Sequence, residues 1–466
     1  NFVKYVSTRG EAPVLAFDEV LLAGLARDGG LYVPESWPQF STADIAALKG
    51  LSYVDLAERI ITPFVGDSLS AAELEAILSE AYSHFETPEV APIKDLGNGE
   101  HLMELFHGPT LAFKDVAMQF LGPLFENVLA ERNEHICIVG ATSGDTGSAA
   151  IEAVRGRDNI DIFVLYPDGR VSDVQRRQMT TIDETNVHTI ALDGTFDDCQ
   201  DALKALFNDT AFRDRMNLSA VNSINWARIV AQIVYYFWAA LKLGGPEQPV
   251  SFAVPTGNFG NVFAGYAAAR MGLPIDQLIV GSNANDILTR FFETGTMAMD
   301  GVEPTISPSM DIQVSSNFER LLFELYGRDG AKVKQTLSAF RDTGAFSIDA
   351  DGLAAARELF DGARYDDIET KAAIGQEFKA SGELLDPHSA VGLLAGRARR
   401  KNADTPLVVL ATAHPAKFPD AVEDASGQFP ALPAHMADLF ERDEKINPLA
   451  NDNAALQSFI EARVKA

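Results

Sequence analysis

A lysine in an apolar stretch is the first residue whose type and setting could do chemistry. Lys114 lies in HGPTLAFKDVAMQF, a helical pattern that places Phe113 and Val116 near it. Burial penalises an ammonium charge, so a buried lysine shifts toward the neutral amine. A neutral amine attacks an aldehyde and forms a Schiff base. The alternative is a solvated lysine, or one paired with Asp115 or Glu104, and this stretch alone favours that alternative.

Two loops rich in glycine and small polar residues are candidate anion sites. In HICIVGATSGDTGSAA a strand is expected to end near Val139 and a helix to begin near Ser148, and in VSFAVPTGNFGNVFAGY a helix opens directly after a strand. Free amides and the dipole at a helix start attract anions. Neither loop has the Lys-Ser/Thr pair of a Walker sequence or the acidic residue of a dinucleotide fingerprint. Each loop alone could equally be an ordinary helix entry.

Short apolar strands alternate with helices from Glu100 onward. The candidate strands are HLMELF, HICIVG, DIFVLYP, VHTIAL, VSFAVP, QLIVGS and PLVVLATA. This alternation predicts an α/β fold with mostly parallel sheets covered by helices. Ligands in such folds bind outside the carboxyl ends of strands, where both loops lie. The chain before about residue 90 is expected to be helix-rich, with Ser70 capping a helix over SAAELEAILSEAYSHF, and the tail from about His435 is expected to form helices.

Composition excludes several classes of function. With 66 acidic and 38 basic residues the formal charge is −28, which opposes binding to nucleic acid or to an anionic membrane. The two cysteines, Cys137 and Cys199, give neither a disulfide framework nor zinc-ligand spacing. No signal-peptide pattern opens the sequence, and the apolar run 229–241, interrupted by Gln232, is shorter than the ~20 residues of a membrane span. We therefore expect a cytoplasmic protein with a buried helix at that run.

Taken together, the lysine and the two loops favour one kind of enzyme. An amine, a cradle for a cofactor phosphate and a cradle for a substrate carboxylate are the parts that a pyridoxal-phosphate enzyme acting on amino acids needs. The sequence resembles the threonine synthase family, within the second fold type of these enzymes, over essentially the whole chain. The resemblance rests on HGPTLAFKD, VGATSGDTGSAA, VNSINWARI, GNFGN, SSNFERLL, LDPHSAVG and TAHPAKF, which stand in the family's order.

The resemblance assigns the cofactor site. Lys114 would carry pyridoxal 5'-phosphate as an imine and move protons at the substrate. Thr412 would meet the ring nitrogen, as a hydroxyl that can donate without forcing that nitrogen to stay protonated. The residues expected to bind the cofactor phosphate through amides and side chains are Gly257, Asn258, Phe259, Gly260 and Asn261.

The resemblance also assigns a substrate site. The substrate carboxylate would bind at SGDTG, where an acidic Asp145 suits orienting the loop better than touching the carboxylate. The substrate phosphate would bind Arg228 and Arg320, because the planar guanidinium matches phosphate geometry, although each could instead form a structural ion pair. The full set of candidates is Thr142, Ser143, Gly144, Asp145, Thr146, Asn222, Ser223, Asn225, Arg228, Asn317 and Arg320.

Four further residues have open roles. Lys417 is a rival Schiff-base lysine, but Pro415 and Pro419 beside it predict a loop in which its charge is solvated. Three histidines are acid/base candidates for which a satisfied core role is slightly favoured: His107, His388 and His414.

The activity implied by the resemblance is conversion of O-phospho-L-homoserine and water to L-threonine and phosphate. Its active site would lie between two cofactor-binding α/β domains within residues 91–440, after an N-terminal domain over 1–90 and before a helical tail over 441–466. Alternatives are a serine or threonine dehydratase of the same fold, a phospho-lyase that releases a keto acid, and a non-catalytic sensor of phosphorylated amino acids. The sequence leaves both a monomer and a homodimer open.

Overall fold

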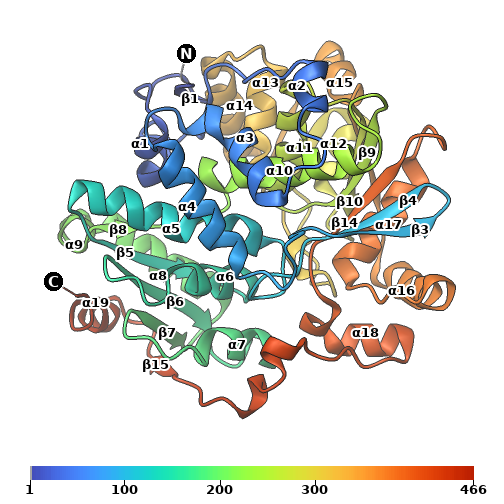
Figure 1. Cartoon of the computed structure of the whole chain (residues 1–466). Coiled ribbons are helices and arrows are strands. Elements are labelled where there is room, and N and C mark those ends of the chain that lie inside the picture. The colour runs from blue at the N-terminus through green and yellow to red at the C-terminus, as the bar shows by residue number, and fades with distance from the viewer. Residues whose placement is uncertain (1–2, 466) are drawn as a thin grey trace. The chain divides into compact units, whose positions relative to one another are not determined.

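The chain forms two units, each with its own parallel or mostly parallel sheet. The computed structural model describes residues 3–465 (Figure 1). Unit 1 takes in the chain up to Ser79, together with Phe85–Phe113 and Ser223–Pro430, and unit 2 takes in Glu80–His84, Lys114–Asn222 and the chain from Ala431. Neither unit is a continuous stretch, and the expected division near residues 90 and 440 stays a prediction.

Unit 1 is built on a six-stranded sheet. The strand order is β13 (Phe360–Arg364), β10 (Ile275–Ser282), β9 (Val250–Pro255), β14 (Leu407–Ala411), β4 (Glu100–Glu104) and β3 (Ile93–Gly97). All neighbours are parallel except β3 and β4. Every residue of β9 and β14 is buried, so both faces of the sheet are covered, as their continuous apolar sequences require. The helices α10 (Trp226–Lys242), α11 (Gly260–Arg270) and α17 (Pro387–Arg399) belong to this unit.

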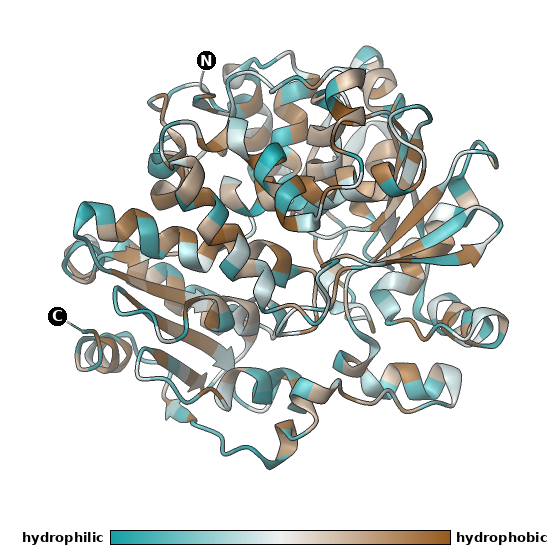
Figure 2. Ribbon diagram, viewed as in Figure 1, coloured by the Kyte–Doolittle hydropathy of each residue, from teal (hydrophilic) through white to brown (hydrophobic). Residues whose placement is uncertain are grey.

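Unit 2 has a smaller sheet in which every strand is parallel. Its order is β15 (Asn447–Leu449), β7 (Val187–Leu192), β6 (Ile160–Pro167), β5 (Ile136–Ala141) and β8 (Leu218–Ser219). The apolar residues of β5 and β6 are evident in Figure 2. The helices of this unit are α5 (Lys114–Arg132), α6 (Asp145–Val154), α7 (Asp173–Thr180), α8 (Phe196–Asn208), α9 (Thr210–Met216) and α19 (Asn453–Glu461).

Helices dominate the first ninety residues, as predicted. They are α1 (Phe17–Ala23), α2 (Thr42–Ala46), α3 (Tyr53–Val65) and α4 (Ala71–Ser83), beside a short antiparallel pair of β1 (Tyr5–Ser7) and β2 (Tyr32–Pro34). The predicted cap of α4 is confirmed, because the Ser70 hydroxyl accepts the Glu73 amide at 3.1 Å and the Glu73 carboxylate accepts the Ser70 amide at 3.1 Å.

The remaining elements of unit 1 lie between its sheet strands or follow them. They are α12 (Ile287–Thr294), β11 (Thr296–Ala298), α13 (Phe318–Leu325), α14 (Gly330–Thr343), β12 (Ala345–Ser347), α15 (Ala350–Arg357), α16 (Asp367–Ser381) and α18 (Pro419–Ser426), with short 3-10 helices at Pro308–Met310 and Pro415–Lys417. Two more, at Ala434–Met436 and Leu439–Glu441, lie in unit 2.

The predicted α/β class with mostly parallel sheets is confirmed, and all seven predicted strands are present. The run 229–241 forms the buried helix α10. Within residues 3–465, no helix combines the length and the apolar content needed to cross a bilayer.

Two local predictions are wrong. The helix expected near Ser148 begins at Asp145, because the Thr142 hydroxyl accepts the amides of Gly144 and Gly147 and closes the turn earlier. The tail from His435 is not purely helical. It contributes the strand β15, which pairs with the edge strand β7 and so satisfies that strand's backbone groups.

Candidate functional site

The turn between β9 and α11 is held in a strained conformation. Phe259, the residue before α11, has φ +69° and is 1% exposed. A bulky residue rarely adopts the left-handed region, so surrounding packing must impose it. The Phe259 ring supplies that packing, with its centroid 5.3 Å from the Phe318 ring and 5.6 Å from the Phe360 ring.

This turn contains several hydrogen-bond donors for which the protein provides no acceptor. Among residues 3–465, the amides of Gly257, Asn258, Phe259 and Gly260 have no hydrogen-bond acceptor. The side-chain amide nitrogen of Asn261 is also buried without an acceptor, whereas its oxygen accepts the hydroxyls of two tyrosines on α10, Tyr235 and Tyr236. Clustered amides at a helix start form an anion site.

A neighbouring segment fixes the shape of the turn. The Ser315 hydroxyl donates to the Gly257 carbonyl at 2.7 Å, and the Asn317 amide donates to the Asn258 carbonyl at 2.9 Å. A Cβ at Gly257 would lie 2.3 Å from the Ser309 carbonyl oxygen, so only glycine fits. Sequence reasoning missed Ser315, because no local pattern shows that it reaches this turn.

Thr412 lies where β14 ends and meets the residue that precedes Lys114. Its carbonyl accepts the Phe113 amide at 2.7 Å, and the His414 amide donates to the Leu111 carbonyl at 2.9 Å. Thr412 is 5% exposed, and its hydroxyl makes no hydrogen bond to another group within residues 3–465. One peptide bond separates Phe113 from Lys114, the partly buried first residue of α5. The backbone of Thr412 is therefore fixed to the residue that precedes Lys114 in the chain.

The rival lysine is not solvated, and that prediction is wrong. Lys417 is 1% exposed, and its amine donates to the Thr110 carbonyl at 2.8 Å. Pro415 begins a 3-10 helix that His414 caps, and this turn folds Lys417 inward. Proline content predicts the turn but not which side of it becomes buried.

The second glycine loop, in unit 2, is closed by a side-chain hydroxyl from within the loop. The Thr142 hydroxyl accepts the amides of Gly144 and Gly147 at 3.0 Å each. The Asp145 carboxylate accepts the Gln175 side-chain amide at 2.8 Å, in keeping with an orienting role. The amides of Ser143 and Thr146 have no acceptor in the described part of the chain. Gln175 carries no sequence signal for this role.

Most of the predicted phosphate-binding set is used to hold unit 1 together. Arg320 is fully buried and donates to the carbonyls of Tyr32 at 3.0 Å and Ile224 at 2.7 Å and to the Asn317 side chain. Asn225 caps α10 by accepting the Ala227 amide at 3.1 Å. Ser223 accepts the Asn317 side-chain amide through its carbonyl at 3.0 Å, and Asn222 is exposed in unit 2. Arg320 therefore has a structural role. It donates hydrogen bonds to carbonyls and does not form the ion pair that was considered as an alternative.

Arg228 differs from Arg320 because its charge has no partner. It lies in the first turn of α10 and is 3% exposed. No carboxylate pairs with it among residues 3–465, and its Nε is buried without an acceptor. Burial lowers the pKa of this guanidinium to about 10. A cation left unpaired at a helix start is a candidate site for an anion.

The three histidines have satisfied partners. His388 binds the Asp386 carboxylate at 2.7 Å through Nδ1 and accepts the Ser309 amide at 3.2 Å through Nε2. Burial lowers the pKa of His414 to about 4. Burial also lowers the pKa of His107, but its hydrogen bond to Glu104 and the charges of Glu104 and Glu86 outweigh burial and raise it above 6.5.

The raised pKa of His107 predicts that replacing this residue changes the free energy of unfolding by an amount that depends on pH. Because its folded-state pKa is raised, its stabilising contribution is fully present below pH 6.5 and is lost as pH rises through the folded pKa. We expect His107→Gln to lower the free energy of unfolding by roughly 1 kcal/mol more near pH 6 than near pH 9 in urea titrations.

His101→Gln serves as the control with the opposite trend. Burial lowers the pKa of His101, so the native state is penalised when this histidine protonates. His101→Gln should therefore raise the free energy of unfolding relative to that of the wild type as pH falls below 6.5. A destabilisation by His107→Gln that is the same at both pH values would contradict the ion pairing described here.

Three family models match the chain. A model described as "Pyridoxal-phosphate dependent enzyme" matches residues 94–412, "Threonine synthase N terminus" matches residues 4–82, and "Threonine synthase, C-terminal" matches residues 389–460. Among curated proteins, the chain is 56% identical over 459 residues to threonine synthase of Pseudomonas aeruginosa, covering 98% of each. It is 42% identical to threonine synthase of Saccharomyces cerevisiae, covering 91% of this chain and 89% of the yeast protein.

Solved structures that resemble this chain come from the same family as the matching family models. The structure of PLP-bound threonine synthase from Brucella melitensis superposes with a TM-score of 0.98 at 55% identity, covering 100% of both chains. Threonine synthase from Escherichia coli superposes with a TM-score of 0.82 at 30% identity, covering 99% of this chain and 100% of the other. A tomato threonine deaminase, at 14% identity and a TM-score of 0.51, shares the fold alone.

Proposed function

Because this chain belongs to the threonine synthase family of pyridoxal-phosphate-dependent enzymes, we propose that it converts O-phospho-L-homoserine and water to L-threonine and inorganic phosphate. This reaction is the last step of threonine biosynthesis. The substrate carries both a carboxylate and a phosphate, so the enzyme must hold two phosphates, one on the cofactor and one on the substrate.

The single observation that carries the proposal is the unpaired, buried Arg228. The turn at residues 257–261 would bind one phosphate, and the unpaired cation of Arg228 at the start of α10 would bind the other. A dehydratase acting on serine or threonine needs only the first. Arg320 is left out of the proposed phosphate site because its donors are engaged with Tyr32, Ile224 and Asn317.

The unused donors at the turn fit the cofactor phosphate. A dianion there would accept hydrogen bonds from the free amides of residues 257–260 and from the buried Asn261 amide, and it would gain from the dipole of α11. The free hydroxyl of Thr412 suits a ring nitrogen, because it can donate or accept. Pyridoxal phosphate, when bound, supplies an electron sink for negative charge that develops on the substrate carbons.

The chain's own groups would position the substrate and move its protons. We assign the cofactor attachment to the Lys114 amine, which after release would take protons at Cα and Cβ and return them to Cα and Cγ. The SGDTG loop would hold the carboxylate through the amides of Ser143 and Thr146, with Asp145 fixed by Gln175.

Arg228 would neutralise the phosphate that leaves when the C–O bond at Cγ breaks. Water supplies the hydroxyl that bonds to Cβ, and its remaining proton goes to the released phosphate, so the atoms balance.

We also place the protein in the cytoplasm, a proposal supported by Cys137 and Cys199, both buried free thiols. We propose that the protein is either a monomer or a homodimer.

Lys114→Ala should abolish production of both threonine and phosphate from O-phospho-L-homoserine, because no other amine is assigned to the cofactor or to proton transfer. The bound cofactor should also lose the near-visible absorption that a lysine linkage gives. NMR of the products and a phosphate assay measure the outcome. A fully active Lys114→Ala variant would refute the assignment, and release of 2-oxobutyrate instead of threonine by the wild type would identify a phospho-lyase.

Arg228→Gln should lower kcat/KM for O-phospho-L-homoserine by roughly 10- to 100-fold, because it removes a charged hydrogen-bond donor from the phosphate. The inhibition constant of inorganic phosphate should rise by a similar factor, while cofactor absorption stays unchanged. Arg341→Gln on the exposed side of α14 is the matched control. If Arg228→Gln weakens neither substrate nor phosphate, the second phosphate site lies elsewhere.

A further inference from the structure

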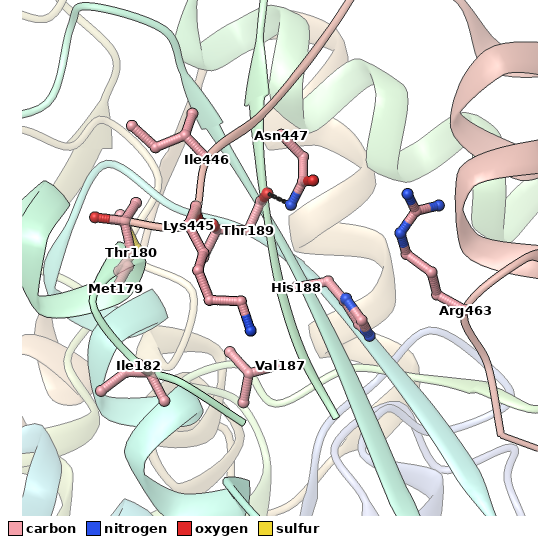
Figure 3. A pocket seen from close by; sticks show the side chains of 10 residues that line it. All are labelled: Met179, Thr180, Ile182, Val187, His188, Thr189, Lys445, Ile446, Asn447 and Arg463. Carbon is pink, nitrogen blue, oxygen red and sulfur yellow. Dashed lines mark hydrogen bonds between the residues drawn. The ribbon is translucent and has the colours of Figure 1, made fainter. Parts of the chain in front are cut away.

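A pocket of about 400 Å³ in unit 2 has two cationic side chains in its wall, but they do not converge on one ligand (Figure 3). Lys445 and Arg463 lie on opposite sides of β7. The Arg463 guanidinium is held on Phe459, with Cζ 3.6 Å from the ring centroid and a hydrogen bond of 3.1 Å to the Phe459 carbonyl. The contacts that carry an inference lie instead in unit 1, beside the turn at residues 257–261.

His388, in the first turn of α17, connects a buried carboxylate to a backbone amide. The side chain is 3% exposed, with Nδ1 at 2.7 Å from the Asp386 carboxylate and Nε2 at 3.2 Å from the Ser309 amide nitrogen. A carboxylate accepts hydrogen bonds, whereas a backbone amide can only donate one. Nδ1 therefore carries the hydrogen of the ring, and Nε2 must keep its lone pair to bind Ser309.

Other contacts hold the ring in this orientation. Asp386 is fully buried and caps α17, because its carboxylate accepts the amides of His388 at 3.1 Å and Ser389 at 2.9 Å. The Phe418 ring packs beside the imidazole, with the two centroids 5.0 Å apart. A side chain that is fixed by hydrogen bonds and by packing can hold its partner in one position.

The segment that His388 binds packs directly against the turn. Ser309 lies in the 3-10 helix Pro308–Met310. A Cβ placed on Gly257 would lie 2.3 Å from the Ser309 carbonyl oxygen and 3.5 Å from Cα of Met310. Contacts this close transmit a displacement, because packed atoms cannot interpenetrate. A shift of Ser309 would therefore move Gly257 and the amides that follow it.

Asp311 anchors the same segment at a second point. Its carboxylate accepts the Asn283 side-chain amide at 2.9 Å, the Thr305 hydroxyl at 2.7 Å and the Thr305 amide at 3.0 Å. None of these bonds involves His388. Loss of the contact between His388 and Ser309 should therefore shift one end of the 3-10 helix without unfolding the segment.

We propose that His388 is a positioning residue for the cofactor phosphate, acting through Ser309 on the amides of the turn at residues 257–261. The inference rests on the proposed function, in which this turn binds that phosphate. Both nitrogens of His388 are engaged, by Asp386 and by Ser309, so its effect is on the direction of the amides. Amides bind an anion well only when they point to a common position.

Two substitutions separate this role from a general contribution to stability. The Oε1 atom of His388→Gln can take the place of Nε2 and accept the Ser309 amide, whereas the shorter side chain of His388→Asn cannot reach it. We expect His388→Asn to raise the dissociation constant of pyridoxal phosphate from the full-length apo-protein by roughly 10-fold, and His388→Gln to raise it by less than ~3-fold. Pyridoxal, which lacks the phosphate, should bind the wild type and both variants alike, and this also shows that they are folded.

Hydrogen exchange of residues 307–311 gives a readout that does not depend on the cofactor. In the apo-protein, exchange should be faster in His388→Asn than in the wild type or His388→Gln, because only His388→Asn leaves the Ser309 amide without its acceptor. His101→Asn is the matched control, at a histidine of β4 that pairs with Val408. It should alter neither the affinity for pyridoxal phosphate nor this exchange.

Equal losses of affinity in His388→Gln and His388→Asn, or a loss for pyridoxal as large as that for pyridoxal phosphate, would overturn the role through Ser309. Wild-type affinity of His388→Asn for pyridoxal phosphate would overturn it as well. Asn261→Asp, which places a negative charge in the turn itself, then tells the two proposals apart. If it weakens pyridoxal phosphate binding, the phosphate site stands without the positioning role, and if it does not, both fail.

Discussion

Hydrogen-bond donors without acceptors, at the start of α11, are the constraint on which the rest of the site depends. A buried donor without an acceptor destabilises a protein by about 1–3 kcal/mol, and this turn places the buried side-chain nitrogen of Asn261 and four free backbone amides beside a strained Phe259. The arrangement persists because Ser315, Asn317 and the aromatic contacts of Phe259 hold it. A bound phosphate would accept hydrogen bonds from these donors. We propose that removing this unfavourable arrangement contributes to the affinity of the protein for its cofactor.

The sequence predicts those features of the fold that depend on local pattern. Continuous apolar runs such as VSFAVP and PLVVLATA predict buried parallel strands, and β9 and β14 form there. The glycine loops at the ends of β9 and β5 follow from the same pattern, because a parallel sheet places ligands at those ends. Short edge strands such as β15, by contrast, have three residues and no periodicity of their own, so only pairing with β7 reveals them.

Roles that depend on distant contacts could not be predicted. Arg228 and Arg320 both follow asparagine-containing segments of the sequence, and only the structure shows that Arg320 binds carbonyls of Tyr32 and Ile224 while Arg228 has no anionic partner among the described residues. Lys417 was expected in solvent and is buried against Thr110, because the chain after β14 folds back on the segment before α5. In each case the deciding partner lies far away in sequence.

Cofactor affinity of Asn261→Asp tests the central claim most directly. This change keeps the oxygen that accepts the hydroxyls of Tyr235 and Tyr236 but replaces the unused amide donor with a negatively charged oxygen. The dissociation constant of pyridoxal phosphate from the apo-protein, measured by absorbance, should rise at least ~100-fold, or about 2.7 kcal/mol. Pyridoxal, which lacks the phosphate, should bind both proteins alike, and Asn402→Asp on the surface should change neither affinity. Wild-type affinity of Asn261→Asp for pyridoxal phosphate would contradict an anion site at this turn.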